Sequence, residues 1–176
     1  MNNNIRKTVL SALFLALAFI IPFFTGHLPQ INSMFCPMHI PIFLCGFICG
    51  WNYGLLIGFC APILRSLTLG LPVFFPTAIC MAFELATYGV LAGILYKIFP
   101  KKIPYIYVSL TISMLVGRIA RALATAICCG FAGTDFSLSA FISTVVIYAI
   151  PGMILHIIII PLIVLLARKA NIIQQT

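Results

Sequence analysis

Four charged residues lie inside long apolar segments: Arg65, Glu84, Arg118 and Arg121. A charged side chain at the centre of a bilayer costs about 2.5–3.5 kcal/mol on insertion scales, so such residues face a protein interior or a wet cavity. Arg118 and Arg121 are three positions apart and therefore share one helix face. The planar guanidinium group binds carboxylates through two parallel hydrogen bonds. These residues predict a polar site that holds an anionic or polar solute.

Glu84 is the acidic member of this set, and Tyr88 follows it on the same helix face. In a binding site, Glu84 would neutralise one arginine or accept a hydrogen bond from the solute. The structural alternative is that Glu84 pairs with one arginine while the others cap carbonyl groups or extend toward lipid headgroups. This alternative applies most directly to Arg65, near the end of its segment.

Two further polar residues are candidates for contact with a solute. His39 begins the second apolar segment, and Asn32 lies in the polar loop before it, which could close over a pocket together with His27. A single histidine in an apolar helix is more often a hydrogen-bonded packing residue. We expect that role for His156, which falls in the inner half of the last predicted segment.

The composition indicates that these segments lie in lipid. Of 176 residues, 63% are hydrophobic and 7% are charged, whereas soluble domains carry about 25% charged residues. So few charges cannot cover a water-facing surface. The net charge of +8 does not indicate nucleic-acid binding, because the basic residues sit in small groups at segment ends. We predict an all-α integral membrane protein with a single domain over residues 1–176.

The apolar runs predict six transmembrane helices. The first two span about 8–24 and 36–50, the third ends near residue 69, and the last three span about 74–98, 105–129 and 138–167. The second is short and interrupted by prolines. Lysines and arginines gather before the first helix, after the fourth and after the sixth, which predicts cytoplasmic N- and C-termini. At about 1.5 Å per residue, Arg118 and Arg121 lie roughly 21 and 25 Å from the inner end, and Glu84 roughly 15 Å from the outer end.

The sequence lacks the motifs that several kinds of catalysis and metal binding require. No P-loop motif is present, so this chain does not hydrolyse ATP by that route. No Ser/His/Asp or His-Glu-x-x-His arrangement occurs, and two acidic residues leave little for hydrolytic acid–base work. The seven cysteines fall mostly in apolar runs and do not match zinc-ligand spacing. We therefore predict neither an enzyme nor a metal or cofactor site.

Ala12 and Ala16 form a small-x-x-x-small step on the first predicted helix. Small residues at this spacing let another helix approach closely, so they are candidates for contact with a partner subunit. Packing within the chain is the alternative.

Four stretches, at 24–26, 37–50, 62–67 and 75–89, resemble the substrate-binding S components of bacterial energy-coupling-factor (ECF) transporters. They include Phe-Thr-Gly, Pro-Met-His-Ile-Pro, Pro-Ile-Leu-Arg-Ser-Leu and Phe-Glu-Leu-Ala-Thr-Tyr-Gly. The resemblance implies a plasma-membrane subunit that binds a vitamin-class solute from outside and topples in the membrane to carry it across. It also implies association with a transmembrane coupling subunit and two cytoplasmic ATPases, with Ala12 and Ala16 matching the step used for that contact.

The solute is left open by the sequence. The stretch around residues 38–41 is similar to a branch of the family linked to small vitamins or their precursors. The arginines favour a carboxylate-bearing solute, with pantothenate the first candidate. Pyridoxine, a hydroxymethylpyrimidine and a riboside precursor of cobalamin remain alternatives. The competing functions are a stand-alone carrier that uses Glu84 as a proton-relay group and a membrane scaffold without ligand.

Overall fold

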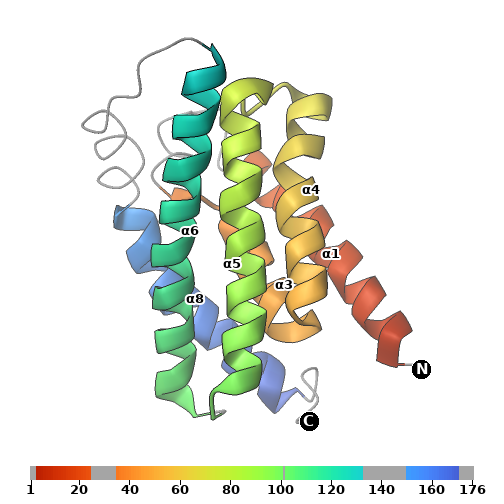
Figure 1. Ribbon diagram of the computed structural model, residues 1–176. Helices are drawn as coiled ribbons and strands as arrows, with labels where there is room; N and C mark the ends of the chain where they lie inside the picture. Colours follow the sequence, from red (N-terminus) through yellow and green to blue (C-terminus); the bar gives the residue numbers. More distant parts are fainter. Residues whose placement is uncertain (1–2, 25–34, 101, 133–149, 171–176) are drawn as a thin grey trace.

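The computed structural model describes residues 3–24, 35–100, 102–132 and 150–170, which form a helical bundle (Figure 1). Within those ranges there is no β-strand, and the all-α prediction is confirmed. The α-helices are α1 (Asn3–Phe24), α3 (His39–Cys49), α4 (Trp51–Leu69), α5 (Ile79–Ile98), α6 (Ile103–Ala132) and α8 (Ile150–Lys169). A short π-helical turn, Phe74–Ala78, leads into α5.

Five of these helices, counting the π-helical turn with α5, are long and apolar enough to cross a membrane. The exception is α3, whose 11 residues extend only about 17 Å, little more than half of a hydrocarbon core of about 30 Å. This helix ends at Gly50, whose φ of 102° is one that residues other than glycine rarely adopt. The prediction of six transmembrane helices is therefore confirmed for five, whereas the second predicted span is too short. Residues 138–149 of the predicted sixth span lie outside the described residues.

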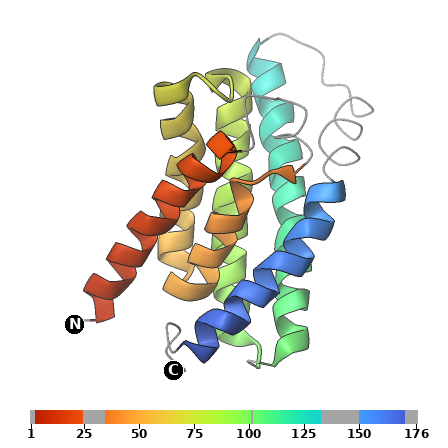
Figure 2. The same cartoon turned by 180° about the vertical axis from the view of Figure 1, so that it is seen from behind.

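The basic residues gather at one end of the bundle. The start of α1, the α5–α6 connection and the end of α8 lie together there (Figures 1 and 2). These segments carry Arg6, Lys7, Lys97, Lys102, Arg168 and Lys169. We call this the basic end. The common end agrees with the charge pattern expected of a cytoplasmic face, and the cytoplasmic location of the termini stays a prediction.

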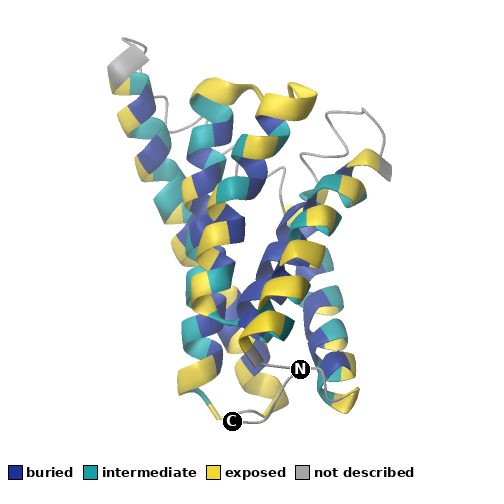
Figure 3. Ribbon diagram, turned by 90° about the vertical axis from the view of Figure 1, so that its right-hand side faces the viewer, coloured by how far each residue is buried: buried dark blue, intermediate teal, exposed yellow. Residues whose placement is uncertain are grey.

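Outward-facing side chains on the long helices are large and apolar. Examples are Val9 and Leu13 on α1, Leu56 on α4, Leu123 on α6 and Ile158 on α8, all exposed. Figure 3 shows exposed positions alternating with buried ones along each helix. A helix with apolar side chains on both its inner and outer faces is suited to a bilayer. Several polar residues within the helices, among them Glu84, Ser113 and His156, are in contrast buried in the interior.

Helices α4 and α5 approach closely because glycines line both of them. A Cβ on Gly54 would lie 2.6 Å from the carbonyl oxygen of Gly89, and a Cβ on Gly89 would overlap the carbonyl oxygen of Gly54. One turn further, a Cβ on Gly58 would overlap the backbone of Leu85. Glycine at such positions lets two helix backbones come into direct contact. This contact fixes the level of Glu84, one residue before Leu85.

Gly89→Ala is expected to lower the free energy of unfolding by about 1–3 kcal/mol, because the added methyl group forces the α4 and α5 backbones apart. Gly130→Ala on α6 is the matched control, because a Cβ there meets no atom within 4 Å. Alanine favours a helix over glycine by about 1 kcal/mol, so the control is expected to be neutral or stabilising. Thermal melting in detergent compares the two. Equal melting temperatures would contradict the close contact.

Candidate functional site

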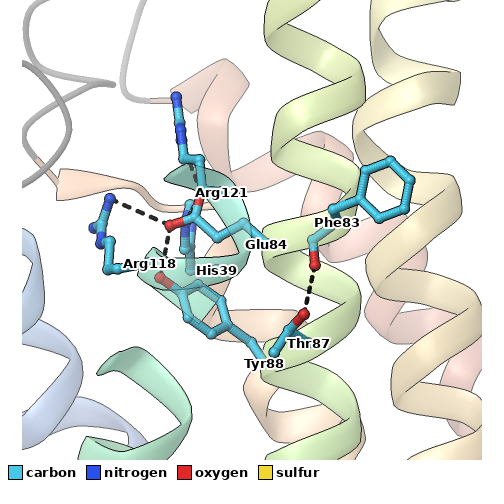
Figure 4. Close-up of polar contacts among 7 residues, drawn as sticks. All are labelled: His39, Phe83, Glu84, Thr87, Tyr88, Arg118 and Arg121. Atoms are coloured by element: carbon cyan, nitrogen blue, oxygen red, sulfur yellow. Dashed lines mark hydrogen bonds and ion pairs between the residues drawn. The ribbon is translucent and has the colours of Figure 1, made fainter. Parts of the chain in front are cut away.

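The carboxylate of Glu84 lies at the centre of the polar interior and is fully buried. The Tyr88 hydroxyl donates a hydrogen bond to its Oε1 over 2.6 Å, and Arg121 Nη1 donates to Oε2 over 2.8 Å. Arg118 Nη1 forms an ion pair with Oε1 at 3.2 Å. Figure 4 shows the three side chains converging on this carboxylate. We call Glu84, Tyr88, Arg118 and Arg121 the Glu84 cluster.

Helical spacing and one glycine place the members of this cluster. Glu84 and Tyr88 are four residues apart on α5, and the two arginines are three apart on α6, so each pair shares a helix face. On α6, a Cβ on Gly117 would overlap the ring of Tyr88. The missing side chain therefore leaves space for the tyrosine ring, whose hydroxyl then meets the carboxylate.

Glu84 contacts both arginines, and the expectation that it pairs with one of them is wrong. Both guanidinium groups reach it because α5 and α6 pack side by side and present these faces to each other. As described, the cluster carries one more positive than negative charge. The other acidic residue of the chain, Asp135, lies outside the described residues. The cluster therefore offers a site that favours an anion.

His39 lies beside the cluster but does not hydrogen bond to it. Its Nε2 is 4.0 Å from Glu84 Oε2, which is beyond hydrogen-bonding distance. Its ring packs at a tilt against Tyr88, with centroids 5.4 Å apart. It also stacks on His156 of α8, with centroids 5.8 Å apart and an angle of 16° between the ring planes. We call His39 and His156 the histidine pair.

His156 belongs to this interior site, which the sequence analysis did not predict. It is the seventh residue of the 20-residue helix α8, and therefore lies in the half away from the basic end. The predicted location in the inner half of the membrane stays a prediction, because residues 138–149 of that segment lie outside the described residues. A histidine in an otherwise apolar segment was the available signal. Its neighbour His39 is distant in sequence, so no spacing rule could pair the two.

The other predicted residues are not brought into the cluster by the described part of the chain. Arg65 on α4 is half-buried, and its Nε is enclosed without a hydrogen-bond partner among the described residues. No ion pair joins it to Glu84 there. Asn32 and His27 lie outside the described residues. Ala12 and Ala16 are both exposed on α1, where another helix can reach them.

A second polar contact, at the basic end, was also missed. Arg168 of α8 donates a hydrogen bond from Nε to the Tyr96 hydroxyl over 2.7 Å, and its guanidinium carbon is 5.1 Å from the centroid of the same ring. The contact joins the end of α8 to α5. Tyr96 lies eight residues beyond Tyr88 on α5, about 12 Å from the Glu84 cluster along the helix, so we assign this contact a structural role.

Metal binding has no support within the described ranges. They contain no group of three or more histidine, cysteine, aspartate or glutamate residues able to hold a metal ion. The two guanidinium groups beside the buried carboxylate of Glu84 also repel a cation. The arrangement is suited to binding a polar or anionic organic solute.

Comparison with known families identifies the family of this chain. The family model described as "ECF transporter, substrate-specific component" matches residues 6–167. The matched region includes the whole Glu84 cluster, the histidine pair, and both alanines of α1. Searches of curated proteins and of solved structures found no match.

Proposed function

The chain belongs to the family of substrate-specific components of ECF transporters, and we propose that it binds a vitamin-class solute at the Glu84 cluster for import. It is a multi-pass membrane protein and a transport subunit rather than an enzyme. The family implies association with the ECF transmembrane and ATPase subunits.

The observation that carries the proposed site is a buried carboxylate shared by two arginines in an apolar bundle. Buried ion pairs are a poor source of stability, because well-packed apolar residues of similar volume often serve as well or better. A cluster with excess positive charge therefore points to a role other than packing. Arg121 contacts Glu84 through Nη1, and the remaining donors of its guanidinium suit a second carboxylate, supplied by the solute.

We propose a solute that carries a carboxylate, with pantothenate the first candidate. A guanidinium group binds a carboxylate through two parallel hydrogen bonds, and it therefore distinguishes a carboxylate-bearing solute from a neutral analogue. Pyridoxine, a hydroxymethylpyrimidine and a riboside precursor of cobalamin lack a carboxylate, and they stand as the alternatives within the same function.

The exposed step of Ala12 and Ala16 on α1 is our proposed contact with the coupling subunit. Exposed large residues flank the alanines: Val9 precedes Ala12, Leu13 lies between the two alanines, and Ile20 follows Ala16. Two small side chains one turn apart let a partner helix approach the α1 backbone. The two ATPase subunits would supply the energy for import.

The direct test is thermal stabilisation of the detergent-purified protein by a panel of B vitamins and their precursors. A solute at a hundredfold excess over its dissociation constant stabilises the folded state by about 2.7 kcal/mol. We expect a clear rise in melting temperature with one member of the panel. A folded protein that responds to none of them would contradict the proposed solute class.

Uptake into vesicles separates the importer from a stand-alone carrier. We expect uptake only when the coupling subunit and ATPases are reconstituted with this chain and ATP is present. Uptake by this chain alone, lost in Glu84→Gln, would instead support a proton-coupled carrier. The contacts of both Glu84 oxygens with arginine or tyrosine argue against that second function, because a relay group has to gain and lose its proton repeatedly.

A further inference from the structure

Three ring nitrogens of the histidine pair are enclosed and lack a hydrogen-bond partner in the described part of the chain. They are Nδ1 and Nε2 of His39 and Nε2 of His156, on side chains that are 1% and 2% exposed. Buried polar side-chain atoms are hydrogen-bonded in the large majority of cases, because leaving them unpaired costs free energy. Three such atoms on two stacked rings, beside a charged cluster, are therefore an unusual feature that calls for a partner.

The contacts of His156 define which kind of partner it needs. Its ring faces the backbone of Phe35 and Cys36, and the Cys36 carbonyl accepts the backbone N–H of His39 at 3.0 Å. Since Nε2 is the ring nitrogen without a partner among the described residues, Nδ1 is the nitrogen that faces these carbonyls and donates to them. A neutral imidazole, the form that is less costly to bury, has one donor and one acceptor nitrogen. His156 Nε2 is therefore an acceptor, and its missing partner is an O–H or N–H donor.

His39 needs two partners of opposite kinds. Both of its nitrogens lack a partner within the described ranges, so a neutral ring there requires one donor and one acceptor. The nearest carboxylate oxygen, Glu84 Oε2, is 4.0 Å away and already accepts from Arg121. The neighbouring Tyr88 hydroxyl donates to Glu84. A hydroxyl group can donate to one nitrogen and accept from another, so it suits this place.

We infer that the histidine pair is a second subsite for the solute, and that it binds a hydroxyl or amide group. The solute would then combine an anionic group, held by Arg118 and Arg121, with this uncharged polar group. The inference rests on the proposed function, because it assigns chemistry to the same interior site. A hydroxylated monocarboxylate such as pantothenate has both features. Nicotinate has the carboxylate but no hydroxyl, and pyridoxine has hydroxyls but no carboxylate.

The first experiment measures binding of pantothenate, nicotinate and pyridoxine to the purified full-length chain by calorimetry. We expect pantothenate to bind at least about tenfold more tightly than either of the others, since one lost hydrogen bond to a buried group corresponds to about that factor. Binding of none of the three contradicts this inference and pantothenate as the solute, whereas the wider vitamin panel still tests the proposed function. Equal or tighter binding of nicotinate contradicts the inference alone.

The second experiment compares His156→Asn with His156→Gln. The asparagine amide reaches about as far as Nδ1 and the glutamine amide about as far as Nε2, so only glutamine places an acceptor where the solute needs it. We expect His156→Asn to weaken pantothenate binding about tenfold and to leave nicotinate binding unchanged. His156→Gln is expected to stay within about threefold of the unmodified protein for both solutes.

The pattern across the two variants separates a subsite from a packing role. Melting temperatures without solute report whether each variant is folded. Equal losses of pantothenate affinity in His156→Asn and His156→Gln would overturn the inference, because they would show that ring packing matters and the Nε2 acceptor does not. Unchanged affinity in His156→Asn would also overturn it while leaving the proposed function intact.

Discussion

Glu84→Gln is expected to lower the free energy of unfolding by about 3–5 kcal/mol, because it removes the buried carboxylate that two partly buried arginines contact. Glutamine keeps the shape of the side chain and can still accept a hydrogen bond from Tyr88. The loss therefore reports the charge and not the packing. For a chain of this length, the change corresponds to a melting temperature roughly 6–20 °C lower.

Tyr88→Phe is the matched control for this prediction, since it removes a neutral donor from the same carboxylate. A hydrogen bond to a charged group contributes about 1.5–3 kcal/mol, so Tyr88→Phe is expected to destabilise the protein less than Glu84→Gln. Arg121→Gln added to Glu84→Gln is expected to recover part of the loss, because only one guanidinium then remains. Equal melting temperatures of Glu84→Gln and the unmodified protein would show that the Glu84 cluster does not stabilise the bundle.

Arg121→Ala is expected to weaken solute binding at least about a hundredfold while leaving the protein folded. The loss of a buried charged partner at a binding site costs about 2–5 kcal/mol, and 2.7 kcal/mol is about a hundredfold in affinity. The fold is expected to persist because Glu84 retains Arg118 and Tyr88. Calorimetry with pantothenate, or with the solute identified by the panel, measures the effect.

Arg65→Ala provides the comparison for an arginine within a membrane helix but outside the Glu84 cluster. Arg65 makes no ion pair with Glu84 in the described part of the chain. We therefore expect the solute affinity of Arg65→Ala to stay within about threefold of that of the unmodified protein. Arg121→Lys keeps the charge but loses the planar donor pair, so an intermediate affinity is expected. Unchanged binding in Arg121→Ala would exclude Arg121 as the anion-binding group.

These two predictions assign different consequences to one network. Removing the carboxylate leaves two cations facing each other in a medium of low dielectric constant, so the main effect falls on stability. Removing one arginine leaves a single pair on Glu84, and the main effect falls on the solute. A network that only held the bundle together would show a stability loss without this difference in binding.

The sequence by itself determined that the helices lie in lipid, that the fold is all-α, and where most of the helices are. Long apolar runs separated by glycine and proline predict helices directly, because both signals are local in the chain. The end of α4 at Leu69 and the end of α5 at Ile98 agree with the predicted boundaries. The charged residues of the site were also found from the sequence, since a charge inside an apolar segment is conspicuous wherever its partner lies.

Which residues contact each other was decided by the tertiary structure. That Glu84 meets both arginines depends on how α5 and α6 face each other, and no local pattern encodes that angle. The stacking of His39 on His156 depends on where α8 crosses α3, and the same holds for Arg168 on Tyr96. Contacts between distant segments depend on packing of the whole chain, whereas helix formation depends on neighbours within a few residues.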